Sequence, residues 1–212
     1  MAHQLTTDHA VAFHFQGAAA PPGWVWRSSL MALLEHARAE TGRDCQTGQV
    51  LCEPKSGSWL GATAYLILLD QIGKCLKPAN APNPAGPNSV ERALQMWSNR
   101  TPDEQHVIQA LRHALAHDFA LSNKNQKSPE YQHRFALDRH PTRLAGLPSK
   151  SWSGDYSSTE DDTTIVSLRA LGDVVERVVA SVTREASEGN IEITLAGGPE
   201  ELIHRYGIVH RA

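Results

Sequence analysis

The sequence is poor in cysteine and contains no hydrophobic run long enough to cross a membrane. Its three cysteines, Cys45, Cys52 and Cys75, are odd in number and never form a CxxC pair. This pattern indicates neither a disulfide framework nor a zinc knuckle, and it fits a reducing cytosol, so we expect a cytoplasmic protein. The most apolar stretch, Trp59–Leu69, is too short for a transmembrane helix, and the N-terminus lacks the pattern of a signal peptide.

Positive charge is not in excess either, because 20 Lys and Arg residues are set against 23 Asp and Glu residues. A generally basic surface for nucleic acid is therefore not predicted, whereas a local basic patch remains open. The sequence also contains no GxxxxGK[ST] loop, no GxGxxG after a predicted strand and no GxSxG elbow. These absences argue against a phosphate-cradling loop and a serine-hydrolase elbow.

Apolar residues recur at helical spacing along most of the chain, which predicts a mostly α fold. We expect residues 1–212 to form a single helical-bundle domain with a core bundle at about 28–120 and a long packing helix at 163–188. Because the apolar residues of the predicted helix Trp59–Lys77 lie on all its sides, this helix should be the central buried one. The predicted helices are Leu30–Thr41 after a cap at Ser28 or Ser29, Trp59–Lys77, Ser89 to Trp97, and Thr163–Glu188.

A few short segments favour extended structure instead. Ala10–Phe15 alternates weakly between apolar and polar residues and predicts a short strand. Arg134–Leu137 and Thr142–Leu147 flank a turn sequence, so a β-hairpin is predicted within residues 132–148. Near the C-terminus, Ile191–Leu195 is a candidate strand, and a last short helix is expected at about Glu200–Tyr206.

The stretch Leu111–Phe119 concentrates groups that can carry chemistry, because Arg112, His113 and His117 lie within six residues. It ends a predicted amphipathic helix that begins at Pro102 after a hydroxyl N-cap. Val107, Ile108, Leu111 and Leu115 form an apolar stripe, with His106, Ala110, His113 and His117 in a second stripe beside it. A cation and titratable imidazoles on such a face need partners or a cleft.

A carboxylate that could serve as such a partner occurs in the central helix. Asp70 stands among Ile67, Leu68, Leu69 and Ile72. One interpretation is an exposed polar face shared with Gln71 and Lys74. The other is a carboxylate that faces Arg112 across a cleft.

The two histidines also have the HxxxH spacing that can hold one metal ion. Ala114, however, follows the first histidine, where the metalloprotease pattern needs glutamate. A third ligand would have to come from elsewhere, such as Asp118 or His106. We therefore expect no metal or other cofactor and keep a metal-binding helical protein using His113 and His117 as an alternative.

Arg112, four intervening residues and His117, with a polar residue directly after the arginine, resemble the Arg-x4-His motif of the HEPN superfamily of ribonucleases and toxins. The resemblance covers the motif helix and, loosely, the helical layout. It implies an antiparallel helical bundle, to which the hairpin and the short C-terminal strand would be additions. It also implies metal-independent RNA cleavage in a homodimer whose two motif helices share a composite active site.

The same resemblance implies roles for individual residues. His117 would act as the general base or acid for attack by the RNA 2′-hydroxyl, and Arg112 would bind the scissile phosphate. His113 would orient the site, with Asp70 in support. RNA and a second copy would be partners, and an antitoxin protein would join them in a toxin or phage-defence setting. Phe119 departs from toxins that carry tyrosine two residues after the motif histidine, which argues against control by nucleotidylation there.

The chemistry of these side chains fits that role without the resemblance. An imidazole takes and gives protons near neutral pH, and a guanidinium binds two phosphate oxygens at once. Two alternatives remain open beside the metal site. Arg112 could be a surface residue, with His113 and His117 favoured near a helix C-terminus by the helix dipole. The chain could also be an inactive HEPN-like module that binds RNA or nucleotide, or dimerises.

Overall fold

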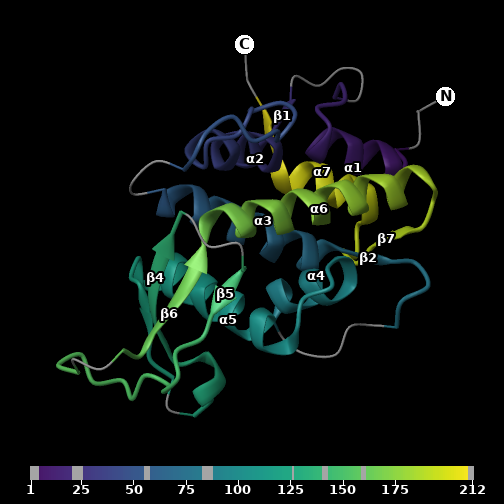
Figure 1. The fold of residues 1–212 in the computed structure, drawn as a ribbon. Coiled ribbons are helices and arrows are strands. Elements are labelled where there is room, and N and C mark those ends of the chain that lie inside the picture. Colours follow the sequence, from purple (N-terminus) through teal and green to yellow (C-terminus); the bar gives the residue numbers. More distant parts are fainter. Residues whose placement is uncertain are drawn as a thin grey trace.

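The computed structural model describes residues 5–20, 26–54, 58–82, 88–125, 127–139, 143–158 and 161–209. Within these ranges the protein is mostly helical, with seven α-helices and several short strands. In Figure 1 most helices fill the upper and right parts of the view, and strands β4, β5 and β6 lie at the lower left beside α5. The mostly α fold predicted from the sequence is thus confirmed, while the HEPN-like arrangement of the bundle stays a prediction.

The central element is α3 (Trp59–Cys75), as the high apolar content on all its sides predicts, although it ends before the predicted Lys77 because residues Leu76–Pro78 form a strand. Ten of its residues are buried, and α2 (Ser29–Glu40), α4 (Ser89–Trp97) and α6 (Leu168–Ser187) all pack against it. The approach of α4 is especially close at Gly73, where an added Cβ would lie 1.9 Å from the carbonyl oxygen of Ser89. Glycine is therefore needed at this crossing because any side chain would separate the two helices.

The predicted first helix is confirmed as α2, and the hydroxyl of Ser28 caps it by accepting from the Met31 N–H. The long predicted helix Thr163–Glu188 is only partly right. Residues Thr163–Ser167 form strand β6, and α6 starts at Leu168 after an N-cap at Ser167. The β-branched run at the start of this segment favours a strand, and the serine cap ends the strand and begins the helix.

The expected strand at Ala10–Phe15 is wrong, because Thr7–Phe15 forms helix α1. The hydroxyl of Thr6 accepts from the His9 N–H and so provides the N-cap that starts the helix. Five consecutive or nearly consecutive residues of α1 are buried, between α2, α6 and α7 (Gly198–Tyr206). A short helix buried on several sides has no single apolar stripe, so the helical period is absent from its sequence.

The predicted hairpin within residues 132–148 is also wrong. Strand β4 (His133–Asp138) pairs in parallel with β6, and β5 (Ala145–Gly146) pairs antiparallel with the opposite edge of β6. With β3 (Ser122–Asn123), the strands form a four-stranded sheet in the order β3-β4-β6-β5. Strand β6, which comes later in the chain, therefore lies between β4 and β5, although the closeness of β4 and β5 in the sequence favours a direct pairing.

Two small antiparallel ribbons connect the C-terminal part to earlier helices. Strand β7 (Ile191–Ile193), which confirms the strand expected at Ile191–Leu195, pairs with β2 (Leu76–Pro78). The last helix is confirmed as α7, and β8 (Gly207–Val209) follows it and pairs with β1 (Trp26–Ser28). No helix in the described ranges is long and apolar enough to cross a membrane.

A buried ion pair joins α2 to α6 in the interior. Arg38 Nε donates to Glu176 Oε1 at 2.9 Å, and Arg38 Nη2 donates to Glu176 Oε2 at 2.8 Å. The side chains are only 7% and 17% exposed, respectively. The Tyr65 hydroxyl also donates to Glu176, and Arg38 donates to the carbonyls of Cys45 and Gln46. Four of the five N–H groups of Arg38 and both oxygens of Glu176 are therefore hydrogen-bonded, which makes the buried charges tolerable.

His14 is completely buried where α1 meets α7. Its Nε2–H donates to the Leu202 carbonyl at 3.2 Å, and its Nδ1 accepts from the Ser28 hydroxyl at 2.8 Å. Both contacts fit the neutral ring, because a carbonyl can only accept. Burial lowers the pKa of His14 to about 4 from its ordinary 6.5.

The buried His14 should make the protein less stable in mild acid. Unfolded His14 binds a proton below about pH 6.5, whereas the folded residue binds one only near pH 4. The contribution of the neutral, buried His14 to the free energy of unfolding is therefore complete above about pH 6.5. It declines as the pH falls and is lost below about pH 4. The pKa difference corresponds to roughly 3 kcal/mol. Urea unfolding between pH 7.5 and 4 should show the full slope in wild type and in the exposed-site variant His36→Ala, and a shallower slope in His14→Gln, where only the lowered pKa values of other histidines such as His133 still contribute. An unchanged slope in His14→Gln would contradict the assignment.

Candidate functional site

The motif helix is fixed at its start and along its buried side. Helix α5 (Pro102–His113) begins with a capping box, in which Thr101 and Glu104 each bond the other's backbone N–H. Its apolar residues Val107, Ile108 and Leu111 are buried as predicted. These contacts set the rotation of α5, so that Arg112 lies at the boundary between the core and solvent.

The helix changes its geometry directly after this point. Residues Ala114–Asp118 form a π-helical turn, closed by a bond from the Phe119 N–H to the Ala114 carbonyl. Residues five apart lie about 140° from each other around an α-helix, but nearly above each other in an i→i+5 turn. The π turn therefore brings His117 to Arg112, and Arg112 Nη1 lies 3.0 Å from His117 Nε2.

The contact defines the state of the imidazole. A guanidinium has donors only, so Arg112 donates and His117 Nε2 accepts, which places the ring hydrogen on Nδ1. The ring of His117 is exposed to solvent. The neutral ring is the form that a general base needs, and only the guanidinium occupies its acceptor.

Asp70 lies on the other side of Arg112. Its Oδ2 accepts from Arg112 Nη2 at 2.9 Å and from the neighbouring Gln71 Nε2 at 3.2 Å. The side chains of Arg112 and Asp70 are 21% and 15% exposed. The carboxylate thus faces Arg112, the second of the two interpretations of its sequence position. The ion pair holds the guanidinium in place and partly shielded from water.

Arg112 keeps unused hydrogen-bonding capacity. Two of the five N–H groups of a guanidinium are accounted for by Asp70 and His117. Its Nε is buried and has no hydrogen-bond partner in the described part of the chain. A buried donor left unpaired is unfavourable, which is typical of functional positions and ligand sites.

His113 stands beside His117, with ring centroids 4.6 Å apart. Partial burial, together with the nearby positive charge of Arg112, lowers the pKa of His113 below its usual value. His113 is therefore neutral at pH 7 and suited to hydrogen bonding rather than to charge. The third metal ligand that the HxxxH spacing requires is missing among the described residues, and His106 contacts Tyr131 instead. The alternative metal site is thus not formed by these side chains.

Phe119 ends the motif in a left-handed backbone conformation, with φ 50°. The residue is 55% exposed, and its ring contacts that of Trp59 at the start of α3, with ring centroids 4.5 Å apart. A bulky residue in this conformation is strained, and the aromatic contact helps to hold it. The end of the π turn is thereby anchored to α3.

A cleft with a volume of about 550 Å³ adjoins the motif, with His113 on its wall. Helix α5, the start of α4 and the segment between β3 and β4 surround it. Its lining is mostly polar and consists of Asn88, Glu91, Gln109, Ala110, His113, Asn123, Asn125, Ser128 and Tyr131.

The sequence did not indicate this cleft. Its residues come from three segments and show no common spacing. The only signal was the stripe on α5 that contains His113. By contrast, Arg112, His113, His117 and Asp70 were all singled out from the sequence, and the structure brings these four together.

Comparisons with known proteins add no relative, since no family model, no curated protein and no solved structure matches the chain.

Proposed function

We propose that the protein is a metal-independent endoribonuclease of the HEPN type. The observation that carries the proposal is the contact of Arg112 with His117 at 3.0 Å, with Asp70 holding the guanidinium from the other side. A fixed cation next to an exposed neutral imidazole supplies a phosphate-binding group and a proton acceptor at one point. RNA contains its own nucleophile, so no catalytic serine or cysteine is needed.

In the proposed reaction a substrate phosphate takes over the Nη1–H of Arg112 that His117 accepts in the free protein. The released Nε2 of His117 then removes the proton from the 2′-hydroxyl. The 2′-oxygen attacks phosphorus and the bond to the 5′-oxygen breaks, and the proton that His117 has taken up passes to the leaving oxygen. The products are a 2′,3′-cyclic phosphate and a free 5′-hydroxyl. Arg112 stabilises the additional negative charge in the transition state.

The proposal includes a homodimer, as the resemblance to HEPN ribonucleases implies. Two motif helices would then line one composite active site with both Arg112–His117 pairs. A toxin or phage-defence role would add an antitoxin protein as partner. Phe119 has no hydroxyl group, so nucleotidylation at this position is not part of the proposed regulation.

The test is cleavage of a mixed-sequence RNA by the purified protein in excess EDTA. The expected result is RNA fragments with 2′,3′-cyclic phosphate ends. The same sequence with 2′-deoxyribose throughout should remain intact, because it lacks the nucleophile. Binding of RNA without cleavage would instead support an inactive RNA-binding module. If the protein neither binds nor cleaves RNA, the Asp70–Arg112–His117 contacts would serve only to connect α3 to the end of α5.

A further inference from the structure

The carboxylate of Asp70 has a second donor, which belongs to the next residue on α3. Gln71 Nε2 donates to Asp70 Oδ2 at 3.2 Å, and the same oxygen accepts from Arg112 Nη2 at 2.9 Å. A carboxylate can only accept hydrogen bonds, so the nitrogen of the Gln71 amide has to face Asp70. The amide oxygen of Gln71 is thereby left to accept from another group.

Tyr206, the last residue of α7, provides that donor. Its hydroxyl donates to Gln71 Oε1, and it therefore accepts from the thiol of Cys75, whose Sγ lies 3.4 Å away. Burial raises the pKa of the Tyr206 phenol and also that of the Cys75 thiol, so both groups keep their protons at neutral pH. Gln71 and Cys75 are four residues apart on α3, which places both on the helix face that meets Tyr206.

These contacts form one path of hydrogen bonds that leads from α7 to the motif. Tyr206 donates to Gln71, and Gln71 donates to Asp70. Arg112 donates to the same oxygen of Asp70 and, from its other terminal nitrogen, interacts with His117. In Figure 1, α7 lies toward the top of the view and α5 toward the bottom, and α3 runs between them. A reversed Gln71 amide would set its oxygen against the Asp70 carboxylate, so the order of donors and acceptors has a single solution.

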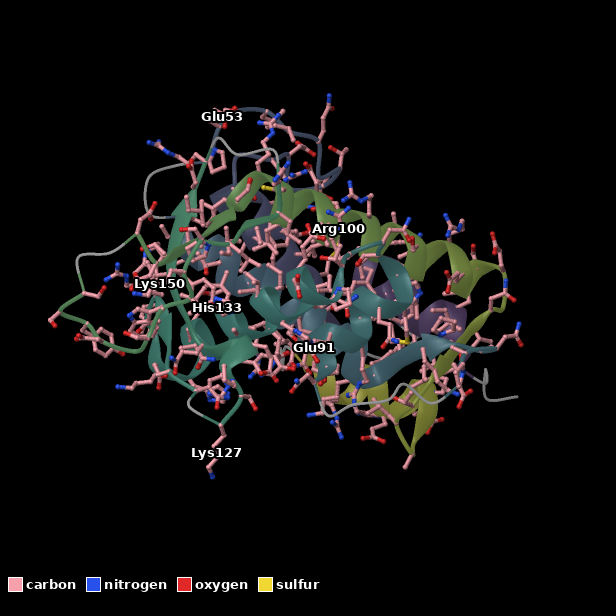
Figure 2. All side chains as sticks on the ribbon, turned by 60° about the horizontal axis from the view of Figure 1, so that its bottom comes forward. Glu53, Glu91, Arg100, Lys127, His133 and Lys150 are labelled. Atoms are coloured by element: carbon pink, nitrogen blue, oxygen red, sulfur yellow. The ribbon has the colours of Figure 1, made fainter. Side chains whose placement is uncertain are left out.

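The far end of the path is fixed by α1 and α2. The hydroxyl of Ser29 on α2 donates to the Tyr206 carbonyl at 2.8 Å, and the Tyr206 ring makes an edge contact with His14 on α1, with ring centroids 6.1 Å apart. Gln71 and Tyr206 are both half-buried, whereas a loop side chain such as Lys127 extends away from the body in Figure 2. Water competes less for hydrogen bonds between half-buried groups. The Gln71 amide is therefore held between a fixed donor and the Asp70 carboxylate.

We propose that Gln71 and Tyr206 are positioning residues for the proposed RNA cleavage. Tyr206 fixes the orientation of the Gln71 amide, and Gln71 in turn fixes the oxygen of Asp70 that binds the guanidinium. A guanidinium held in this way stays in line with His117 Nε2 and keeps the imidazole in the Nδ1–H form. Both residues act through Asp70 rather than on the substrate, and their role rests on the ribonuclease function proposed above.

Two variants that keep the shape of the side chain test the proposal. Gln71→Met keeps the length and removes both the donor and the acceptor, and Tyr206→Phe removes only the hydroxyl. Each should lower kcat for RNA cleavage by about three- to tenfold, the effect of one hydrogen bond, and change KM little. Gln95→Met on α4 and Tyr156→Phe alter exposed residues of the same types and should keep the wild-type kcat.

The tautomer of His117 provides a readout that requires no cleavage. A free imidazole favours the Nε2–H form in water, whereas a hydrogen bond from Arg112 to Nε2 imposes the Nδ1–H form. Nitrogen chemical shifts of His117 at pH 8 distinguish the two. Wild type and both controls should show the Nδ1–H form, and Gln71→Met and Tyr206→Phe should show an increased share of the Nε2–H form.

The two measurements also separate this proposal from the ribonuclease. Wild-type tautomers in both variants would overturn it even if kcat falls, because the loss would then not pass through Arg112. A wild-type kcat in both variants would overturn it as well and would retain the ribonuclease. If wild type does not cleave RNA, the ribonuclease is rejected, and a tautomer shift would still retain the control of Arg112 by Gln71 and Tyr206. If Gln71→Met does not fold, Tyr206→Phe decides alone.

Discussion

His117→Ala should lower the rate of RNA cleavage by about 10³-fold, because the variant has no group at this position to remove the 2′-hydroxyl proton. Arg112→Ala should lower the rate to a similar degree, since the phosphate would lose a fixed cation with two donors. Arg112→Lys should restore little, because an ammonium cannot bridge Asp70 and the phosphate with a planar fork. Rates in excess EDTA over RNA of mixed sequence provide the measurement.

The controls separate chemistry from folding. His36→Ala and Arg177→Ala remove exposed residues of the same two types from α2 and α6 and should leave the rate unchanged. Arg112→Ala also leaves the partly buried Asp70 carboxylate without its partner, so its rate should be measured well below its melting temperature. A wild-type rate in His117→Ala or Arg112→Ala, with intact folding, would reject the proposed roles.

Asp70→Asn distinguishes positioning from direct participation in the same assay. Asp70 touches Arg112 and Gln71 rather than His117 in the described contacts, so we expect it to act through the guanidinium. The variant should lower kcat by about tenfold and change KM little, within the range of positioning effects. An unchanged kcat would show that the ion pair serves stability alone.

Glu176→Gln should reduce the free energy of unfolding by about 3–5 kcal/mol, which is the largest stability effect that we expect. The substitution leaves Arg38 buried with a neutral partner, and an unpaired buried charge is strongly unfavourable. The Tyr65 hydroxyl would keep an acceptor, so the loss reflects charge more than hydrogen bonding. Urea unfolding at pH 7.5 measures the change, away from the titration of His14.

The neighbouring residue on α6 provides the matched control. Arg177→Gln removes a charge at an exposed position and should change the stability by less than about 0.5 kcal/mol. If Glu176→Gln reduces the free energy of unfolding by less than about 1 kcal/mol, the Arg38–Glu176 pair contributes no more than a surface salt bridge, despite its burial.

The sequence predicted those parts of the fold in which one helix face or one cap determines the structure. Helix α3 followed from its apolar residues, and α5 from the Thr101 cap and its buried stripe. The pairing of β4 with β6 could not be predicted in this way, because β6 lies far along the chain. The turn sequence after β4 instead favoured pairing of β4 with the nearby segment that contains β5. Local pattern does not encode the choice between distant strands.

The candidate site shows the same division. Asp70 was identifiable as a carboxylate in an apolar helix, and Arg112 and His117 as a cation and an imidazole close in sequence. Their contact at 3.0 Å was not derivable from an α-helical projection, which separates the two by about 140°. Most of the cleft beside His113 gave no signal, since its lining residues come from three separate segments with no common spacing.

The π turn at Ala114–Asp118 makes the site sensitive to the hydrogen-bonding pattern of the turn rather than to the identity of its residues. The residues between His113 and His117 are Ala114, Leu115 and Ala116, and none carries a polar side chain. Removal of one of them would restore α-helical hydrogen bonding and place the histidine four residues after Arg112, a spacing at which side chains meet on an ordinary α-helix. A relative with such a deletion would therefore keep the contact without a π turn. At the present length, by contrast, a change that returned this turn to α-helical hydrogen bonding would carry His117 about 140° away from Arg112 and separate the pair while leaving its composition intact.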